Sequence, residues 1–400
     1  MLLRLSIEHV HNAGQCPISS PSLRPRAALH SGPRPRIVQN KVSKLCNRMQ
    51  DLLTLSLLVD IYHAVGCISL DVITGYAFDN CRNLLDTPDF AAAALDGDKK
   101  GQPLLWQLQQ LPWIVKLRQA PKRVLKAVSP TTAIFAAQKA AMDAQIRDLQ
   151  RRVNAGEKPA DNKQTIFHQL LDSNAADGHV VPPIEVMRDE AGVIVAAAGE
   201  TMGVTFTMAF YRVLASDRVR ETLMTELIAA FPDPEAELKF EELEKRPYLT
   251  AVLKESLRLV FPLPGRLPRV VPDGGIDFNG YRIPAGMAMS MSQWMQHRNE
   301  AIFPNPMIFE PERWLSEAGK GIGGPEDYFI AFGRGSRVCL GMTLAWCELY
   351  VLQLLDRLVT EMVWVPRYRQ PIGTNIWLSQ KYAGLGSWLG HTCANNDTYG

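Results

Sequence analysis

The chain has 400 residues, of which 46% are hydrophobic and 21% are charged, a composition typical of a globular protein with a large buried core. A formal net charge of +2 is too small to indicate nucleic acid as a partner. Seven cysteines without paired short spacings exclude a disulfide-rich scaffold and are typical of a reducing compartment.

The amino-terminal part of the chain is locally basic. Between residues 4 and 48, Glu8 is the single acidic residue. The basic residues of this stretch include Arg24, Arg26, Arg34, Arg36, Lys41 and Lys44. The opening segment is too short and too polar for a signal anchor, and no window reaches the ~18 consecutive apolar residues that a membrane-spanning helix needs. We therefore expect no anchor helix in this chain.

Apolar residues at three- and four-residue spacing predict helical runs along most of the chain. These runs cover Leu52 to Phe90, residues 131–153, Glu185 to about Arg220, and Phe240 to Leu259. After Phe261, frequent Pro and Gly residues separate short apolar pieces and predict short strands and turns. Helix is expected again from Gly341 to about Val359, so the sequence predicts a mainly α protein with a small β portion.

The most informative segment reads F-G-R-G-S-R-V-C-L-G and begins at Phe332. Cys339 lies just ahead of a predicted helix, whose free N–H groups favour a thiolate, and a thiolate is an axial ligand for haem iron. Gly335 lets the backbone approach a macrocycle, Phe332 can shield the sulfur, and Arg337 can reach a haem propionate. The alternative is a Gly-rich turn that happens to contain a buried cysteine.

The pattern F-x-x-G-x-R-x-C-x-G resembles the signature of the cytochrome P-450 superfamily, haem-thiolate monooxygenases of which fungal microsomal members look most similar. This resemblance implies haem b with Cys339 as its axial ligand. It covers residues 22–365 as one catalytic domain and leaves 1–21 and 366–400 as divergent ends. It therefore implies the family's mainly α fold, apparently truncated and incomplete in its amino-terminal β region.

Two further segments resemble the family's structural core. The sequence E-S-L-R places Glu255 and Arg258 at i and i+3 on a helix, a spacing that alone usually marks a surface pair. Arg313 follows in F-E-P-E-R-W. In the family these three residues form a buried lock around the haem, so the resemblance implies a structural role for them.

The segment A-A-G-E-T-M, which begins at Ala197, resembles the family's oxygen-activation segment. The resemblance implies that Glu200 and Thr201 relay protons. The segment departs from the family pattern at Ala198 and Met202. The alternative role of Thr201 is structural, since a threonine within a helix can bond its own i−4 carbonyl.

Other residues receive roles only from the resemblance. Arg269 and Arg26 fall on positions that bind haem propionates, although ordinary surface arginines would give the same pattern. Ala197, Pro264 and Leu267 fall on positions that line the substrate pocket.

The resemblance implies a monooxygenase that takes electrons from an NADPH–cytochrome P-450 reductase and inserts one atom of O₂ into a small apolar substrate. A terpene or polyketide is the expected class of substrate. The alternatives are a haem-thiolate isomerase or dehydratase and an inactive remnant. The expected location is the surface of the endoplasmic reticulum, with peripheral membrane contact, or otherwise the cytoplasm. Sequence alone identifies neither the substrate, its regioselectivity nor the reductase.

Overall fold

The structure is a computed structural model that describes residues 35–55, 59–90, 95, 131–157, 165–172, 179–233, 239–263, 267–315, 324–352, 362–366 and 376–380. Its longer helices are α3 (Pro35–Thr54), α4 (Ile61–Phe78), α7 (Thr131–Asn154), α9 (Ile184–Leu214), α10 (Asp217–Ala230), α12 (Pro247–Leu259) and α15 (Met342–Leu352). Short helices are α8 (Ile166–Leu171), α11 (Phe240–Leu243) and α13 (Gln293–His297). The mainly α fold is confirmed.

The strands are few and short. Strands β1 (Val59–Asp60), β7 (Ile376–Gln380) and β6 (Met362–Pro366) form one antiparallel sheet in that order. The other strands form two pairs, β2 (Arg269–Val270) with β5 (Ala288–Met289), and the hairpin β3 (Ile276–Phe278) with β4 (Tyr281–Ile283). Both pairs lie after α12, where the Pro- and Gly-rich segment predicted strands and turns.

Polar caps divide two of the expected helical runs. The run from Leu52 to Phe90 is not one helix, because Asp60 caps a new helix by accepting a hydrogen bond from the His63 N–H, and α4 ends at Phe78. The run from Glu185 to Arg220 breaks after α9, where the Ser216 side chain caps α10 in the same way. Capping side chains accept N–H groups that the first turn of a helix leaves without partners.

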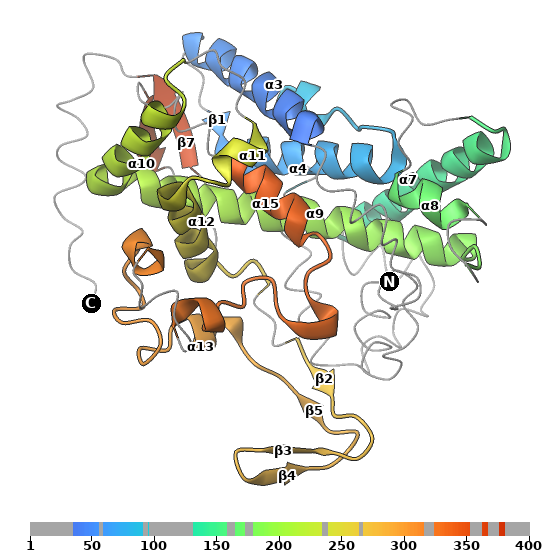
Figure 1. Ribbon diagram of the computed structural model, residues 1–400. Helices are drawn as coiled ribbons and strands as arrows, with labels where there is room; N and C mark the ends of the chain where they lie inside the picture. The colour runs from blue at the N-terminus through green and yellow to red at the C-terminus, as the bar shows by residue number, and fades with distance from the viewer. Residues whose placement is uncertain are drawn as a thin grey trace.

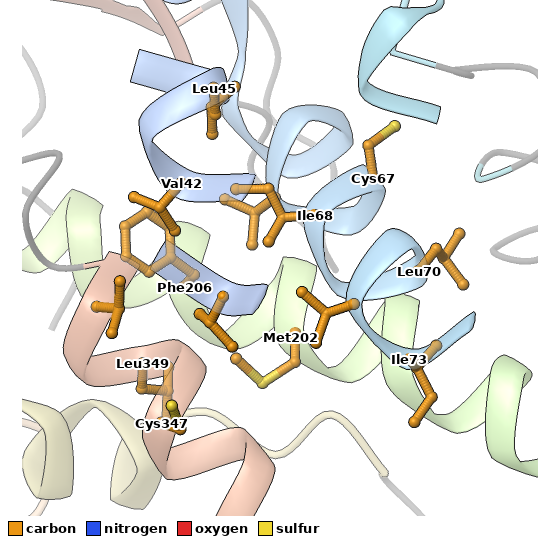
Figure 2. Close-up of a cluster of buried hydrophobic side chains, with 14 of the residues drawn as sticks. Val42, Leu45, Cys67, Ile68, Leu70, Ile73, Met202, Phe206, Cys347 and Leu349 are labelled. Carbon is orange, nitrogen blue, oxygen red and sulfur yellow. The ribbon is translucent and has the colours of Figure 1, made fainter. Parts of the chain in front are cut away.

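Helix α9 crosses the middle of the molecule, and α4 packs along it (Figure 1). Figure 2 shows the resulting core, whose buried side chains include Ile68 and Leu70 of α4 and Met202 and Phe206 of α9. Side chains of α3 and α15 complete this cluster, among them Val42, Leu45, Cys347 and Leu349. The core thus unites the consecutive helices α3 and α4 with α9 and α15, which lie far along the chain.

Both α4 and α9 are long and apolar enough to cross a membrane. The window of α4 is 94% buried inside the protein, however, and that of α9 is half buried. Their apolar character is thus accounted for at least in part by packing in the core.

Close contact between α4 and α9 depends on glycines in α9. A Cβ atom on Gly203 would lie 3.1 Å from the Tyr62 ring and 3.2 Å from the Tyr62 carbonyl oxygen. A Cβ on Gly199 would lie 2.9 Å from the end of the Leu70 side chain. Since a backbone carbonyl cannot turn aside as a side chain can, Gly203 fixes the spacing of the two helices.

We predict that Gly203→Ala lowers the free energy of unfolding by about 1–3 kcal/mol, because the added methyl group overpacks the α4–α9 contact. Urea unfolding followed by circular dichroism measures the change. The matched control is Gly75→Ala in α4, where the nearest atom to a new Cβ is 4.0 Å away. This control should gain about 0.5–1 kcal/mol from the better helix propensity of alanine. Equal effects of the two substitutions would contradict the packing argument.

Candidate functional site

A tight loop presents Cys339 ahead of α15. The Cys339 N–H donates to the Phe332 carbonyl at 2.8 Å, and the Gly333 N–H donates to the Ile330 carbonyl at 2.9 Å. Gly335 has a φ of 78°, in the left-handed region that favours glycine, and begins the short 3-10 turn Gly335–Arg337. The loop is therefore closed by its own backbone.

Cys339 is the exposed cysteine among those that the structure describes. Although the residue reaches the surface, desolvation by the surrounding loop raises the pKa of its thiol, and the Gly341 N–H acts in the opposite direction. The role of the helix amino terminus in holding a thiolate stays a prediction for the metal-bound protein. The first N–H of α15, that of Met342, donates to the Cys339 carbonyl rather than to the sulfur. Coordination by a metal deprotonates a thiol outright.

The two side chains expected beside the sulfur are both half-buried. Phe332 packs on Trp346 of α15, with ring centroids 5.8 Å apart, and thereby fastens the loop to its helix. Arg337 lies two residues before Cys339, in the 3-10 turn.

The structure brings Glu255, Arg258 and Arg313 together. Arg258 donates to both carboxylate oxygens of Glu255 at 2.8 and 2.9 Å, and Arg313 Nε donates to Oε1 at 3.1 Å. The Trp314 indole N–H donates to Oε2 at 3.0 Å. The Glu255 and Arg258 side chains are fully buried, so each charge depends on its partners.

Sequence reasoning missed the link from this ionic cluster to the cysteine loop. Arg258 donates to the His297 carbonyl at 2.7 Å, and His297 Nε2 accepts the Ile330 N–H at 3.0 Å. Burial and nearby Arg258 lower the pKa of His297 to about 4, so its ring stays neutral and can accept this bond. Gln293 donates to the Ile330 carbonyl at 2.7 Å. Helix α13 therefore holds the start of the loop.

The α9 segment expected to activate oxygen makes two defined contacts. Thr201 Oγ1 donates to the Ala197 carbonyl at 2.6 Å, which is the structural role considered as the alternative. Glu200 Oε2 accepts the Tyr62 hydroxyl at 2.7 Å, a contact from α4 that no motif signalled. Ala197 is exposed although α9 is central, whereas Gly199 is buried against α4. Thus α9 turns small residues toward an open side.

Arg269 and Leu267, expected at a propionate and at the pocket, both lie on the protein surface. Arg269 is exposed, and its guanidinium donates back to the Leu267 and Pro268 carbonyls at 2.9 and 3.0 Å. Leu267 is exposed and has a φ of 46°. Arg26 and Pro264 lie outside the described residues.

Glu348 of α15 is a further buried group. Burial raises the pKa of its carboxyl to about 7, while a hydrogen bond with Ser69 lowers it. Its Oε2 atom has no hydrogen-bond partner among the described residues. A carboxyl group in such surroundings keeps its proton up to a higher pH than an ordinary glutamate does.

This raised pKa predicts that stability falls as pH rises. The folded protein retains the Glu348 proton to about pH 7, whereas an ordinary glutamate loses it near pH 4.5. Between these values Glu348 should lower the free energy of unfolding by about 1.4 kcal/mol per pH unit. Glu348→Gln should remove this slope in urea unfolding at several pH values. The lowered pKa of His297 makes the free energy of unfolding rise with pH between about 4 and its ordinary value of 6.5. The measurement is therefore the difference in pH dependence between the unsubstituted protein and Glu348→Gln.

The residues present fit an iron porphyrin. The one exposed thiol among the described cysteines lies on a loop where a Cβ on Gly335 or Gly341 would meet nothing within 4 Å. Large apolar side chains are exposed in this loop and in the segment that follows α12, among them Leu340, Leu263 and Leu267. A thiol donor with an apolar surround is the ligand set of haem-thiolate proteins.

The comparisons agree with this geometry. The profile of the family described as Cytochrome P-450 matches residues 26–361. A cytochrome P-450 monooxygenase of Ascocoryne sarcoides is 32% identical over 79% of this chain and 62% of its own length. An N-acetyltryptophan 6-hydroxylase of Emericella nidulans is 30% identical over 80% of this chain and 62% of its own. The chain thus spans about three fifths of the length of such relatives.

Proposed function

Since the chain belongs to the cytochrome P-450 family, we propose that it acts as a haem-dependent monooxygenase. The observation that carries this proposal is the exposed Cys339 thiol on a loop that buried contacts hold from α13 and α15. Haem b bound there supplies the oxygen chemistry that amino-acid side chains lack. Two electrons and two protons reduce one atom of O₂ to water, while the other atom enters a C–H bond of the substrate.

We assign the cofactor contacts as follows. Cys339 serves as the axial ligand, and its loop keeps the sulfur at a fixed place relative to α15. Arg337 binds a propionate, as a guanidinium can with two parallel hydrogen bonds. Arg269 and Arg26 remain further propionate candidates, and in the case of Arg269 the guanidinium must first leave the carbonyls of its own strand.

The proton path that we propose uses the two polar residues of the α9 segment. Thr201 keeps its hydroxyl proton on the Ala197 carbonyl, at the edge of the open side of the helix. Glu200, the residue before Thr201, holds or releases a proton. The Tyr62 hydroxyl of α4 holds the Glu200 carboxyl in place by donating a hydrogen bond to it. The small side chain of Ala197 leaves room for O₂ and substrate.

The substrate class, electron donor and location are parts of the same proposal. Resemblance to fungal members supports a small apolar substrate such as a terpene or polyketide, with Leu267 and Pro264 at the pocket. An NADPH–cytochrome P-450 reductase supplies the electrons. The expected location is the membrane surface of the endoplasmic reticulum.

We predict that Thr201→Ala separates electron transfer from productive oxygen use. With a fungal NADPH–cytochrome P-450 reductase, the variant should still consume NADPH, but the ratio of hydrogen peroxide to water formed should rise at least about 10-fold, because general-acid delivery is lost. Oxygen uptake, NADPH consumption and peroxide release give this ratio.

The control is Thr205→Ala. Thr205 makes the same kind of i−4 bond one turn later, to the Thr201 carbonyl at 2.7 Å. Equal ratios of hydrogen peroxide to water in the two variants would show that the role of Thr201 is structural. Turnover of an oxygenated substrate without NADPH would instead favour the isomerase or dehydratase alternative.

A further inference from the structure

A buried polar contact joins three helices behind the α9 segment. Ser69 of α4 is fully buried, and its Oγ donates to the Ala198 carbonyl of α9 at 3.2 Å. The Glu348 carboxyl of α15 forms a hydrogen bond with the same serine hydroxyl. Figure 2 labels buried chain neighbours of both residues, Ile68 and Leu70 on α4 and Cys347 and Leu349 on α15.

The number of protons available decides which group donates and which accepts in this contact. A serine hydroxyl has a single proton to donate, and it cannot give that proton to both the Ala198 carbonyl and a carboxylate. If Glu348 carries a proton, it donates to Ser69 Oγ, and Ser69 donates to Ala198. Both bonds are then satisfied at once. A deprotonated Glu348 would instead accept the hydrogen bond from the Ser69 hydroxyl. The Ala198 carbonyl would then lose its donor.

The surroundings favour the protonated arrangement. Glu348 is 1% exposed, and no ion pair joins it to a cation within the part of the chain that the structure describes. Its neighbour Cys347 is also buried, and burial raises the pKa of that thiol, so it stays neutral. An isolated charge in such a place costs more than keeping the proton.

The contact ends at the turn that carries Thr201. The Ala198 carbonyl lies 3.5 Å from Thr201 Oγ1, whereas the Ala197 carbonyl accepts that hydroxyl at 2.6 Å. A donor already bound to the Ala198 carbonyl therefore favours donation by Thr201 to Ala197. At the other end of the contact, Glu348 belongs to α15, the helix that follows Cys339.

We propose that Glu348 and Ser69 are positioning residues, which hold the Ala198 carbonyl and thereby fix the Thr201 hydroxyl relative to the helix that follows Cys339. This inference rests on the proposed role of Thr201 in oxygen activation. Neither residue touches the reacting atoms, so their effect reaches the reaction only through Thr201.

Infrared spectroscopy tests the contact without turnover. At neutral pH the purified protein should show the C=O stretch of a protonated carboxylic acid that disappears in Glu348→Gln. In Ser69→Ala the same band should shift, because its hydrogen-bond partner is gone. Absence of the band from the unsubstituted protein, or no shift in Ser69→Ala, would overturn the proposal.

The second readout is the ratio of hydrogen peroxide to water formed with NADPH, a fungal reductase and O₂. Ser69→Ala should raise this ratio about 3- to 10-fold, the factor that one lost hydrogen bond represents. Glu348→Gln should stay close to the unsubstituted protein, because a glutamine amide can also donate to Ser69. The control is Ser256→Ala, since Ser256 is a similarly buried serine whose hydroxyl donates within its own helix, to the Val252 carbonyl at 2.7 Å.

The outcomes separate the proposals. If Ser69→Ala equals Ser256→Ala, or if Glu348→Gln behaves like Ser69→Ala, the positioning role is wrong. If Ser69→Ala does not fold, Glu348→Leu, which leaves the hydroxyl in place, must raise the ratio or the proposal fails. A missing haem-thiolate spectrum in the unsubstituted protein would refute the proposed function, while the infrared test would still decide the contact.

Discussion

Replacement of Cys339 by alanine is expected to abolish the red-shifted Soret band that thiolate-ligated haem gives when the reduced protein binds carbon monoxide. The physical reason is that a thiolate ligand on haem iron would produce this spectrum, and no other described cysteine is exposed. Activity with NADPH and a reductase should fall to background in the same variant. The spectrum of purified protein, reconstituted with haem, is the measurement.

The control for this substitution is Cys81→Ala. Cys81 is half-buried and lies beside Lys41, with Nζ 2.9 Å from Sγ. This variant should keep the band unchanged. A thiolate spectrum that survives in Cys339→Ala would mean that another residue binds the iron, and the proposed function would lose its basis.

The second large effect is expected for Glu255→Gln. Glu255 is the shared acceptor of Arg258 and Arg313, and all three side chains are buried. Loss of its charge leaves the fully buried Arg258 guanidinium without its ion-pair partner, while Arg313 keeps its pair with Glu310 at 3.0 Å; breaking such a buried pair costs about 3–5 kcal/mol. Against a total stability of about 5–15 kcal/mol, this loss should unfold much of the protein at 37 °C. Urea unfolding and the yield of folded protein measure it.

Glu242→Gln is the matched control, because Glu242 and Lys245 form another i,i+3 ion pair, with a distance of 2.7 Å. This pair is exposed, and its loss should cost less than about 1 kcal/mol. Similar urea midpoints for the two variants would show that the contacts of Glu255 stabilise the protein no more than a surface ion pair does.

The position of this cluster explains why its loss should also reach the haem site. Arg258 connects through the His297 carbonyl to α13, and His297 and Gln293 hold Ile330 at the start of the cysteine loop. We therefore expect any folded fraction of Glu255→Gln to show a weakened thiolate band. The ionic cluster supports the loop without touching it.

Much of this protein could be predicted from local sequence signals. Residues that act together within one turn, such as Glu255 and Arg258 or the loop from Phe332 to Cys339, stand close enough in the chain for spacing to reveal them. Apolar periodicity located the helices for the same reason, since it repeats along each segment. Their ends were less accurate, because a single capping side chain such as Asp60 decides where a helix begins.

Only the tertiary structure decided the contacts between distant segments. Tyr62 and Glu200 are 138 residues apart in the chain, and Ser69 and Ala198 are 129 residues apart, yet each pair forms a hydrogen bond. The protonated state of Glu348 likewise follows from burial among helices that no local pattern reports. The sequence by itself singled out Cys339 as the proposed iron ligand, because that motif is local. Packing determined which side chains hold it in place, because burial and hydrogen-bond partners exist only once the helices meet.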